Sequence, residues 1–87
     1  MNIKYIGKFK KHFKERVQSH SNLYQKFNER VDLFVKSPDD PILKDHSLKG
    51  SKQRFRAFSI TGDIRVIYFL EADNVYFVDI GSHNQVY

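Results

Sequence analysis

The chain of 87 residues contains no cysteine, so it can form neither a disulfide nor a thiolate metal site. No apolar run approaches the roughly 18 residues that a membrane-spanning helix needs, and the N-terminus lacks an apolar segment of the signal-peptide type. The four histidines are scattered, and there is neither an HExxH motif nor a pair of carboxylates. These absences predict a cytoplasmic protein without a metal or other cofactor.

The residues that are present are sufficient for one folded domain spanning residues 1–87. The chain is 40% hydrophobic and 15% aromatic, a composition that argues against intrinsic disorder. A chain of this length can bury a modest core without covalent crosslinks. No internal repeat or linker suggests a second domain.

The net charge of +5 is distributed unevenly. Residues 1–36 carry nine Lys or Arg against three acidic residues, whereas residues 37–87 carry six against seven. A small domain with a basic part is attracted to nucleic acid or to an acidic protein partner. The alternative is that the lysines form only a solvated surface.

The N-terminal half predicts a short strand followed by two helices. Residues 2–6 alternate polar and apolar side chains, and from Gly7 onward Phe9, Phe13 and Val17 recur at helical spacing. A second helix is expected from a cap at Ser21 or Asn22 to about residue 36, antiparallel to the first. His12 and His20 are expected at the surface. The apolar positions of the second helix are Leu23, Phe27, Val31 and Phe34.

The C-terminal half predicts strands. Two runs rich in β-branched and aromatic residues, 64–71 and 75–80, are separated by Ala-Asp-Asn and indicate a β-hairpin. Residues 54–60 alternate and indicate a third strand with Arg54 and Arg56 on one face, and residues 42–48 are expected to be extended. This order predicts an α+β fold, with two N-terminal helices packed on one face of a curled antiparallel sheet of about four strands.

Basic and imidazole side chains gather near the strand ends and turns of this half. Arg65 begins one hairpin strand and His83 follows its partner, so an antiparallel hairpin brings them to the same corner. Arginine suits phosphate binding, and imidazole can transfer a proton near neutral pH. The candidate residues are His46, Lys49, Lys52, Arg54, Arg56, Arg65 and His83.

This set suggests metal-free cleavage of a phosphodiester. In RNA the 2′-hydroxyl is the nucleophile, so the protein supplies a base, an acid and positive charge for the phosphorane. Each residue also has a purely structural interpretation. The histidines can be exposed turn residues, Arg65 can pair with Asp63 or Glu71, Asp63 can be a turn former, and Tyr87 can be a frayed terminus.

Three short motifs, in this order and spacing, resemble the RelE/ParE superfamily of toxins from prokaryotic toxin–antitoxin pairs, and the RelE and YafQ branches most. They are the HxLKG turn at 46–50, the GDxRVIY strand at 62–68 and the GSHxxxY ending at 81–87. The resemblance covers essentially the whole chain. It implies a RelE-like fold, a toxin that cleaves mRNA in the ribosomal A site, and a small cognate antitoxin that silences it.

The resemblance also implies roles for individual residues. His83 corresponds to the general acid and His46 to an acid–base residue, while Arg65 would hold the scissile phosphate. The remaining implied site residues are Asp63 as an acid of the active site, Arg56 and Lys49 as cations near the RNA backbone, and Tyr87 as an aromatic that stacks on a base.

The chain departs from the YafQ pattern at two positions. Ser59 stands where YafQ-like proteins carry a further histidine, and Ile64 stands where they often carry tryptophan. One proton-transfer group of that branch is therefore absent, while the RelE-like Arg65 is present. The general base is left between His46 and Asp63, and we favour His46.

Two other functions are compatible with the same fold. A ParE-like protein would inhibit DNA gyrase without a nuclease site, although such an inhibitor does not need the two histidines and Arg65. A non-catalytic RNA-binding domain, or a decayed toxin, would need only the excess of Lys and Arg side chains, which would bind RNA without cleaving it. Cleavage and supercoiling assays distinguish the three functions.

Overall fold

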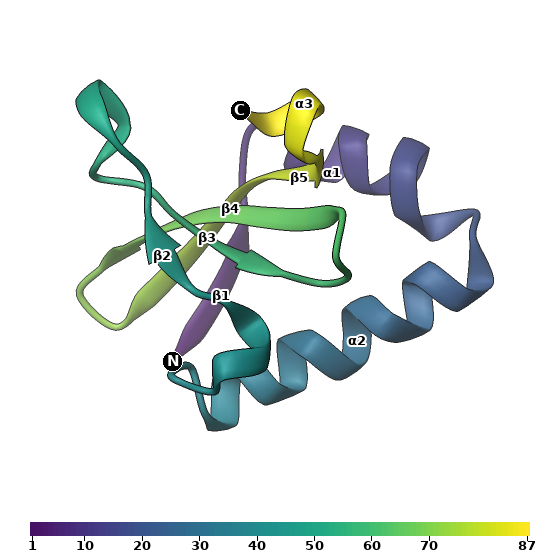
Figure 1. The fold of residues 1–87 in the computed structure, drawn as a ribbon, viewed down its shortest axis with the longest axis horizontal. Coiled ribbons are helices and arrows are strands. Elements are labelled where there is room, and N and C mark those ends of the chain that lie inside the picture. The colour runs from purple at the N-terminus through teal and green to yellow at the C-terminus, as the bar shows by residue number, and fades with distance from the viewer.

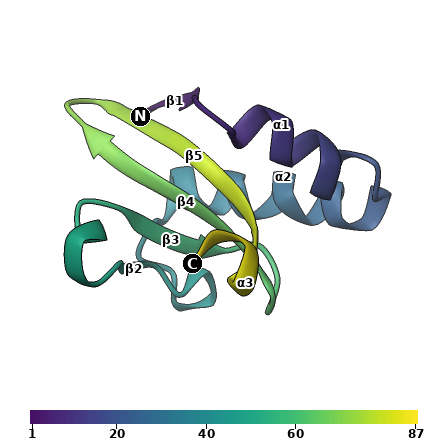
Figure 2. The ribbon, with the colours of Figure 1, turned by 90° about the horizontal axis from the view of Figure 1, so that it is seen from above.

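The computed structural model describes residues 1–87 as a five-stranded sheet with two helices packed on one face (Figure 1). The strand order is β1-β5-β4-β3-β2, which Figure 2 shows from above. Every neighbouring pair is antiparallel except β1 and β5, which are parallel. The strands are β1 (Asn2–Tyr5), β2 (His46–Ser47), β3 (Arg56–Ser59), β4 (Ile64–Glu71) and β5 (Asn74–Ser82).

The α+β class and the helices on one face are confirmed, but the sheet is mixed and not purely antiparallel. The chain leaves β1 into the helices and returns beside β1 only with β5. Such a long crossover permits parallel pairing, which a tight hairpin turn cannot connect. The alternating pattern of residues 2–6 predicts a strand but not its partner or its direction.

Both predicted N-terminal helices are present. They are α1 (Phe9–Phe13), continued by the π-helical turn η1 (Lys14–Gln18), and α2 (Ser21–Lys36). The predicted cap is wrong, because Ser21 is already helical and the residue before it makes no side-chain cap. No helix combines the length and apolar character that crossing a membrane requires.

Three short elements complete the chain. Residues 42–48 were expected to be extended, but they contain the 3₁₀ turn η2 (Pro41–Leu43) before β2, and a second such turn, η3 (Gly50–Lys52), follows β2. The C-terminal helix α3 (His83–Val86) has no counterpart in the sequence prediction. Its four residues are too few for a helical period to be recognised.

An aromatic core joins the helices to the sheet. Phe34 of α2 stacks on Phe58 of β3 with ring centroids 4.4 Å apart, and Phe77 of β5 is completely buried between elements. Phe9 and Phe27 are also buried, as their helical spacing predicts. Aromatic pairs add to the stability that area burial gives, so this core fixes the sheet on which the site is built.

The final hairpin has the predicted form. Ala72 adopts a left-handed conformation in the turn, with φ of 55°, and β4 then pairs with β5. The register places Arg65 opposite Gly81 and Ile64 opposite Ser82. The start of β4 therefore lies beside the residue that precedes His83, as the sequence predicts.

Candidate active site

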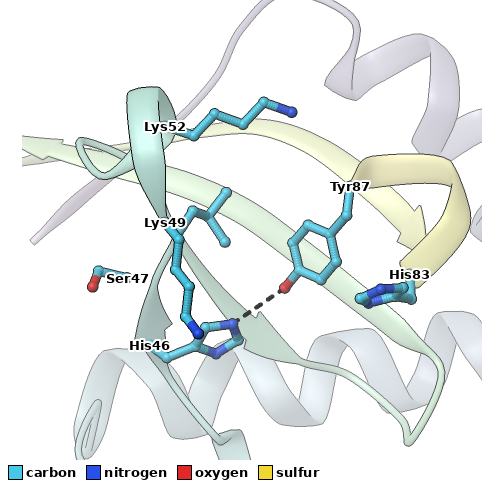
Figure 3. Close-up of a pocket in the computed structure, with 7 residues that line it drawn as sticks. His46, Ser47, Lys49, Lys52, His83 and Tyr87 are labelled. Atoms are coloured by element: carbon cyan, nitrogen blue, oxygen red, sulfur yellow. Dashed lines mark hydrogen bonds between the residues drawn. The ribbon is translucent and has the colours of Figure 1, made fainter.

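A pocket of about 310 Å³ lies where β2 and the turn after it face α3 (Figure 3). It is built from two segments far apart in sequence, which the strand order β2-β3-β4-β5 brings to the same end of the sheet. Its lining contains five of the residues selected from the sequence: His46, Lys49, Lys52, His83 and Tyr87.

Tyr87 links the two imidazoles of the pocket. Its hydroxyl lies 3.4 Å from Nε2 of His46, a residue 41 positions earlier. Its ring meets that of His83 edge-on, with centroids 4.5 Å apart. Figure 3 shows Tyr87 between the two histidines, with Ser47 pointing away from them. Two groups able to transfer protons are thus held at opposite sides of one phenol.

The contacts of His46 define its tautomer. Nδ1 lies 2.9 Å from the carbonyl oxygen of Lys44, and a carbonyl can only accept a hydrogen bond. Nδ1 therefore carries the proton, which leaves Nε2 of the neutral ring as an acceptor directed at the pocket. Burial raises the pKa of Tyr87, and the charge of Arg65 only partly opposes this. The phenol is therefore protonated at neutral pH and donates to Nε2.

One hydrogen bond ties α3 to the end of β5, and a second ties η1 to the same end of that strand. The backbone N–H of Ser82 donates to Oε1 of Gln85 at 2.7 Å. Arg16, from η1, donates to the carbonyl oxygen of Ile80 at 2.8 Å. His83 and Tyr87 are four residues apart across this turn of helix, so they project from the same side.

We expect Gly81→Ala to destabilise the protein and to misplace α3. An added Cβ would lie 2.6 Å from Nη1 of Arg16 and 2.7 Å from Oε1 of Gln85. Both side chains can move away, but each then loses a backbone partner, at a cost of about 1–2 kcal/mol in total. Urea unfolding should show this loss. Gly62→Ala, where no atom lies within 4 Å of the added carbon, should change stability much less.

The two arginines expected on one strand face are held by different partners. The guanidinium of Arg54 lies 4.4 Å over the ring of Phe69 and 3.3 Å from Glu71. Arg56 donates to Asp45 at 3.0 Å. The strand begins only at Arg56, so the alternation does not extend to Arg54. Neither arginine lines the pocket.

Arg65 lies at the edge of the site, and Asp63 lies in the turn that precedes it. Nη1 of Arg65 donates to the backbone carbonyl of Asp63 at 3.2 Å, while neither an Asp63 nor a Glu71 carboxylate pairs with it. Arg65 does not line the pocket, but the strand register places it opposite Gly81, two residues before His83. Asp63 is exposed in the turn before β4 and does not line the pocket.

A buried carboxylate that was not selected from the sequence joins α1 to β5. Asp79 is only 4% exposed, and its Oδ1 lies 2.6 Å from Nδ1 of His12. Lys8 and Arg16 each lie 3.7 Å from the same carboxylate. His12 is therefore partly buried and in polar contact with Asp79, and it is not the surface residue that was expected. The sequence signal for this contact was a set of basic and imidazole side chains that recurs every four residues: Lys8, His12 and Arg16.

No group of three or more His, Asp or Glu side chains in the structure is arranged to hold a metal ion. The pocket contains two histidines and two lysines. Lysine ammonium groups offer no lone pair while protonated. These imidazole and ammonium groups can transfer protons and stabilise negative charge.

Comparison with known proteins identifies relatives along the whole chain. Residues 1–87 match the family model described as a bacterial toxin of type II toxin–antitoxin system, YafQ. No protein in the curated set matches the chain.

Several solved structures that resemble this chain are named as toxins. YafQ from E. coli strain BL21(DE3) superposes with a TM-score of 0.82 at 25% identity, covering 99% of this chain and 97% of that one. E. coli YafQ in its complex with DinJ gives 0.80 at the same identity and coverage. A metal-bound toxin from Helicobacter pylori gives 0.78 at 27% identity, covering 100% and 99% of the two chains. The YoeB/ParE toxin from Agrobacterium tumefaciens, at 15% identity, shares the fold with a TM-score of 0.77 over 95% and 99% of the chains.

Proposed function

Since the chain belongs to the YafQ family of toxins from bacterial type II toxin–antitoxin systems, we propose that it is an endoribonuclease that cuts mRNA in the ribosomal A site. The observation that carries this proposal is the convergence of His46, His83 and Tyr87 with two lysines in one open pocket. The pocket supplies a base, an acid and positive charge, which are the groups that RNA cleavage requires.

His46 is the base of the proposed reaction. Its Nε2, freed by the Nδ1–H bond to Lys44, takes the proton of the 2′-hydroxyl when RNA displaces the Tyr87 hydroxyl. O2′ then attacks phosphorus, and a pentavalent phosphorane forms. Its negative charge is stabilised by Lys49 and Lys52 from the pocket and by Arg65 at its edge.

His83 is the acid of the proposed reaction. Its ring makes no hydrogen bond to another residue, so a protonated His83 can give its proton to the departing 5′-oxygen as the P–O5′ bond breaks. The products are a 2′,3′-cyclic phosphate, which water can open to a 3′-phosphate, and a 5′-hydroxyl. No step is assigned to a metal ion. Tyr87 is exposed enough to stack on the neighbouring base.

The remaining candidates are not assigned a step. Asp63 lies outside the pocket, and Arg54 is engaged by Phe69 and Glu71. Arg56 is bonded to Asp45. We therefore place the base at His46 and the phosphate-binding charge at the lysines and Arg65.

A small cognate antitoxin is the second proposed partner. DinJ forms a complex with YafQ in E. coli, and family membership extends that arrangement to this chain as a proposal. Coexpression of this chain with the product of an adjacent small gene should yield a stable complex in which RNA cleavage is suppressed.

Translation in a reconstituted system with the purified protein tests the proposed activity. Primer extension should show cuts at codons in the A site, with 5′-hydroxyl ends downstream, and mRNA without ribosomes should stay intact. Intact mRNA during normal translation would overturn the proposal. A supercoiling assay with purified gyrase would then test the ParE-like alternative.

We expect the double variant Lys49→Gln, Lys52→Gln to weaken binding of the ribosome-bound mRNA. Each lysine that contacts a phosphate contributes about one unit to the slope of log affinity against log salt. KM should therefore rise, and its salt dependence should fall by about two units. Lys36→Gln, on the exposed end of α2, is the matched control for charge. An unchanged salt slope would remove both lysines from the RNA contact.

A further inference from the structure

We propose that Asp45, Arg56 and Tyr68 form a positioning network that holds His46 in its catalytic orientation, so that Arg56 acts through the base and not on the RNA phosphate. The inference deepens the proposed nuclease function and rests on it for its kinetic consequences. Its structural consequence, the fixed tautomer of His46, can be measured without cleavage.

The network starts in the core. Tyr68 is only 2% exposed, and its ring packs edge-on against Phe34 of α2 with centroids 5.0 Å apart. Its hydroxyl donates to Oδ2 of Asp45. Nε of Arg56 donates to Oδ1 of the same carboxylate at 3.0 Å and also lies 3.3 Å from the Tyr68 hydroxyl. Both carboxylate oxygens are thus tied to groups that the sheet holds in place.

Asp45 is connected to the site through the next residue in the chain, His46. Asp45 directly precedes β2, and successive side chains of an extended chain point to opposite faces. Asp45 points toward the core hydroxyl of Tyr68, so His46 points the other way, into the pocket. β2 has only two residues and lies at the edge of the sheet. Its few ladder bonds give it little stiffness, and the Asp45 carboxylate supplies a second attachment.

The bonds to the Asp45 carboxylate help to maintain the backbone conformation of the preceding residue, Lys44. Lys44 adopts a left-handed conformation with φ of 50°, which non-glycine residues rarely adopt and which persists where neighbouring structure imposes it. In this conformation its carbonyl oxygen accepts the Nδ1–H of His46 at 2.9 Å. With Asp45 anchored on one side of this bond and β2 on the other, the imidazole has a fixed tautomer and direction.

The tyrosine and the arginine of the network each keep one charge state across the working pH range. Burial, reinforced by the bond to Asp45, raises the pKa of Tyr68, so its hydroxyl remains a donor. The bond to Tyr68 raises the pKa of Arg56, so the guanidinium remains charged. The titratable groups that face His46 directly are Lys49 and Lys52 from the turn after β2, and His83 and Tyr87 from α3.

Two roles for Arg56 give opposite kinetic results. A guanidinium on the phosphate would act in substrate binding, so its loss would raise KM and reduce the salt dependence of binding. A guanidinium that orients the base would act on the chemical step, so its loss would lower kcat with little change in KM. Arg56 is bonded to Asp45 and does not line the pocket, which favours the second role.

Tyr68→Phe tests the network because it removes the hydroxyl and keeps the ring in the core. In the parent protein, ¹⁵N NMR of His46 should show the Nδ1–H tautomer. In the variant it should show a mixture with the Nε2–H form, which the free imidazole prefers. We expect kcat for cleavage on the ribosome to fall at least about tenfold, since misplacement of a catalytic group by about 1 Å can cost about 100-fold. KM should stay within about twofold.

Tyr76→Phe is the matched control, because the Tyr76 hydroxyl has no hydrogen-bond partner and its ring stacks on Phe69 at the other end of the hairpin. It should leave the tautomer and kcat unchanged. Asp45→Asn is a second variant that keeps the shape of the network while weakening both bonds, and it should reproduce the effects of Tyr68→Phe. Thermal unfolding establishes that each variant is folded.

A folded Tyr68→Phe and a folded Asp45→Asn that both keep the parent tautomer of His46 would overturn the network. If Arg56→Gln raises KM and leaves kcat unchanged, Arg56 binds the RNA phosphate and does not orient His46. If the parent protein cuts no mRNA, the nuclease proposal fails by itself, while the tautomer measurement still decides whether the network orients His46.

Discussion

His83→Gln is expected to lower the rate of mRNA cleavage by about 10²- to 10⁴-fold, the usual contribution of a positioned general acid. Glutamine keeps much of the size and hydrogen-bonding capacity of histidine but cannot give a proton to the departing 5′-oxygen. His83 is exposed at the first position of α3, and its ring makes no hydrogen bond within the protein. The substitution should therefore leave the fold and its stability almost unchanged.

Single-turnover cleavage on stalled ribosomes, followed by primer extension, measures this rate directly. His20→Gln is the matched control, because His20 is also exposed and lies between the two N-terminal helices, away from the pocket. Its rate should equal that of the parent. A His83→Gln protein that cuts at the parent rate would show that another group protonates the leaving oxygen.

Phe77→Ala is expected to destabilise the fold by about 3–5 kcal/mol, the usual cost of removing a buried phenylalanine. Phe77 is completely buried, with its ring centroid 5.6 Å from that of Phe9, 5.8 Å from that of Phe58 and 6.2 Å from that of Phe34. These rings come from α1, β3 and α2, so the cavity would open where three elements meet. A domain stable by about 5–15 kcal/mol would lose a large fraction of its stability.

Urea unfolding followed by far-UV circular dichroism measures the loss in the free energy of unfolding. Leu70→Ala is the control, because Leu70 also lies in the hairpin but is 55% exposed; it should cost less than about 1 kcal/mol. A similarly small cost for Phe77→Ala would show that the core can close around the missing ring.

The sequence predicts well those elements whose pattern is local. The first two helices follow from apolar residues that recur every three or four positions, because one helical face must be buried. The hairpin follows from two runs of β-branched and aromatic residues with a short turn between them. Spacing alone identified seven apolar positions of these helices. Four of them are buried, and the other three pack partly buried against the core: Phe9, Val17, Phe27 and Phe34, then Phe13, Leu23 and Val31.

Some errors are local, such as the cap of α2 and the unpredicted α3, but the errors that affect the site concern pairings between distant segments. The parallel partner of β1 lies more than seventy positions away in the chain, and no local pattern encodes its direction. Arg54 and Arg56 look equivalent in the sequence, yet one meets Glu71 and the other meets Asp45. Their partners depend on the register of the strands, which is set when the whole sheet packs against the helices.

The sequence by itself determined which chemical groups this protein has and on which elements most of them lie. His46, Lys49, His83 and Tyr87 could be selected because imidazole, ammonium and phenol groups beside turns are suited to binding and cleaving a phosphodiester. The tertiary structure decided which of them meet, since His46 and Tyr87 are 41 residues apart, with β3, β4 and β5 between them in the chain. It also kept Arg56 out of the pocket, because the folded sheet places the Asp45 carboxylate beside the guanidinium and the two form a charge-assisted hydrogen bond.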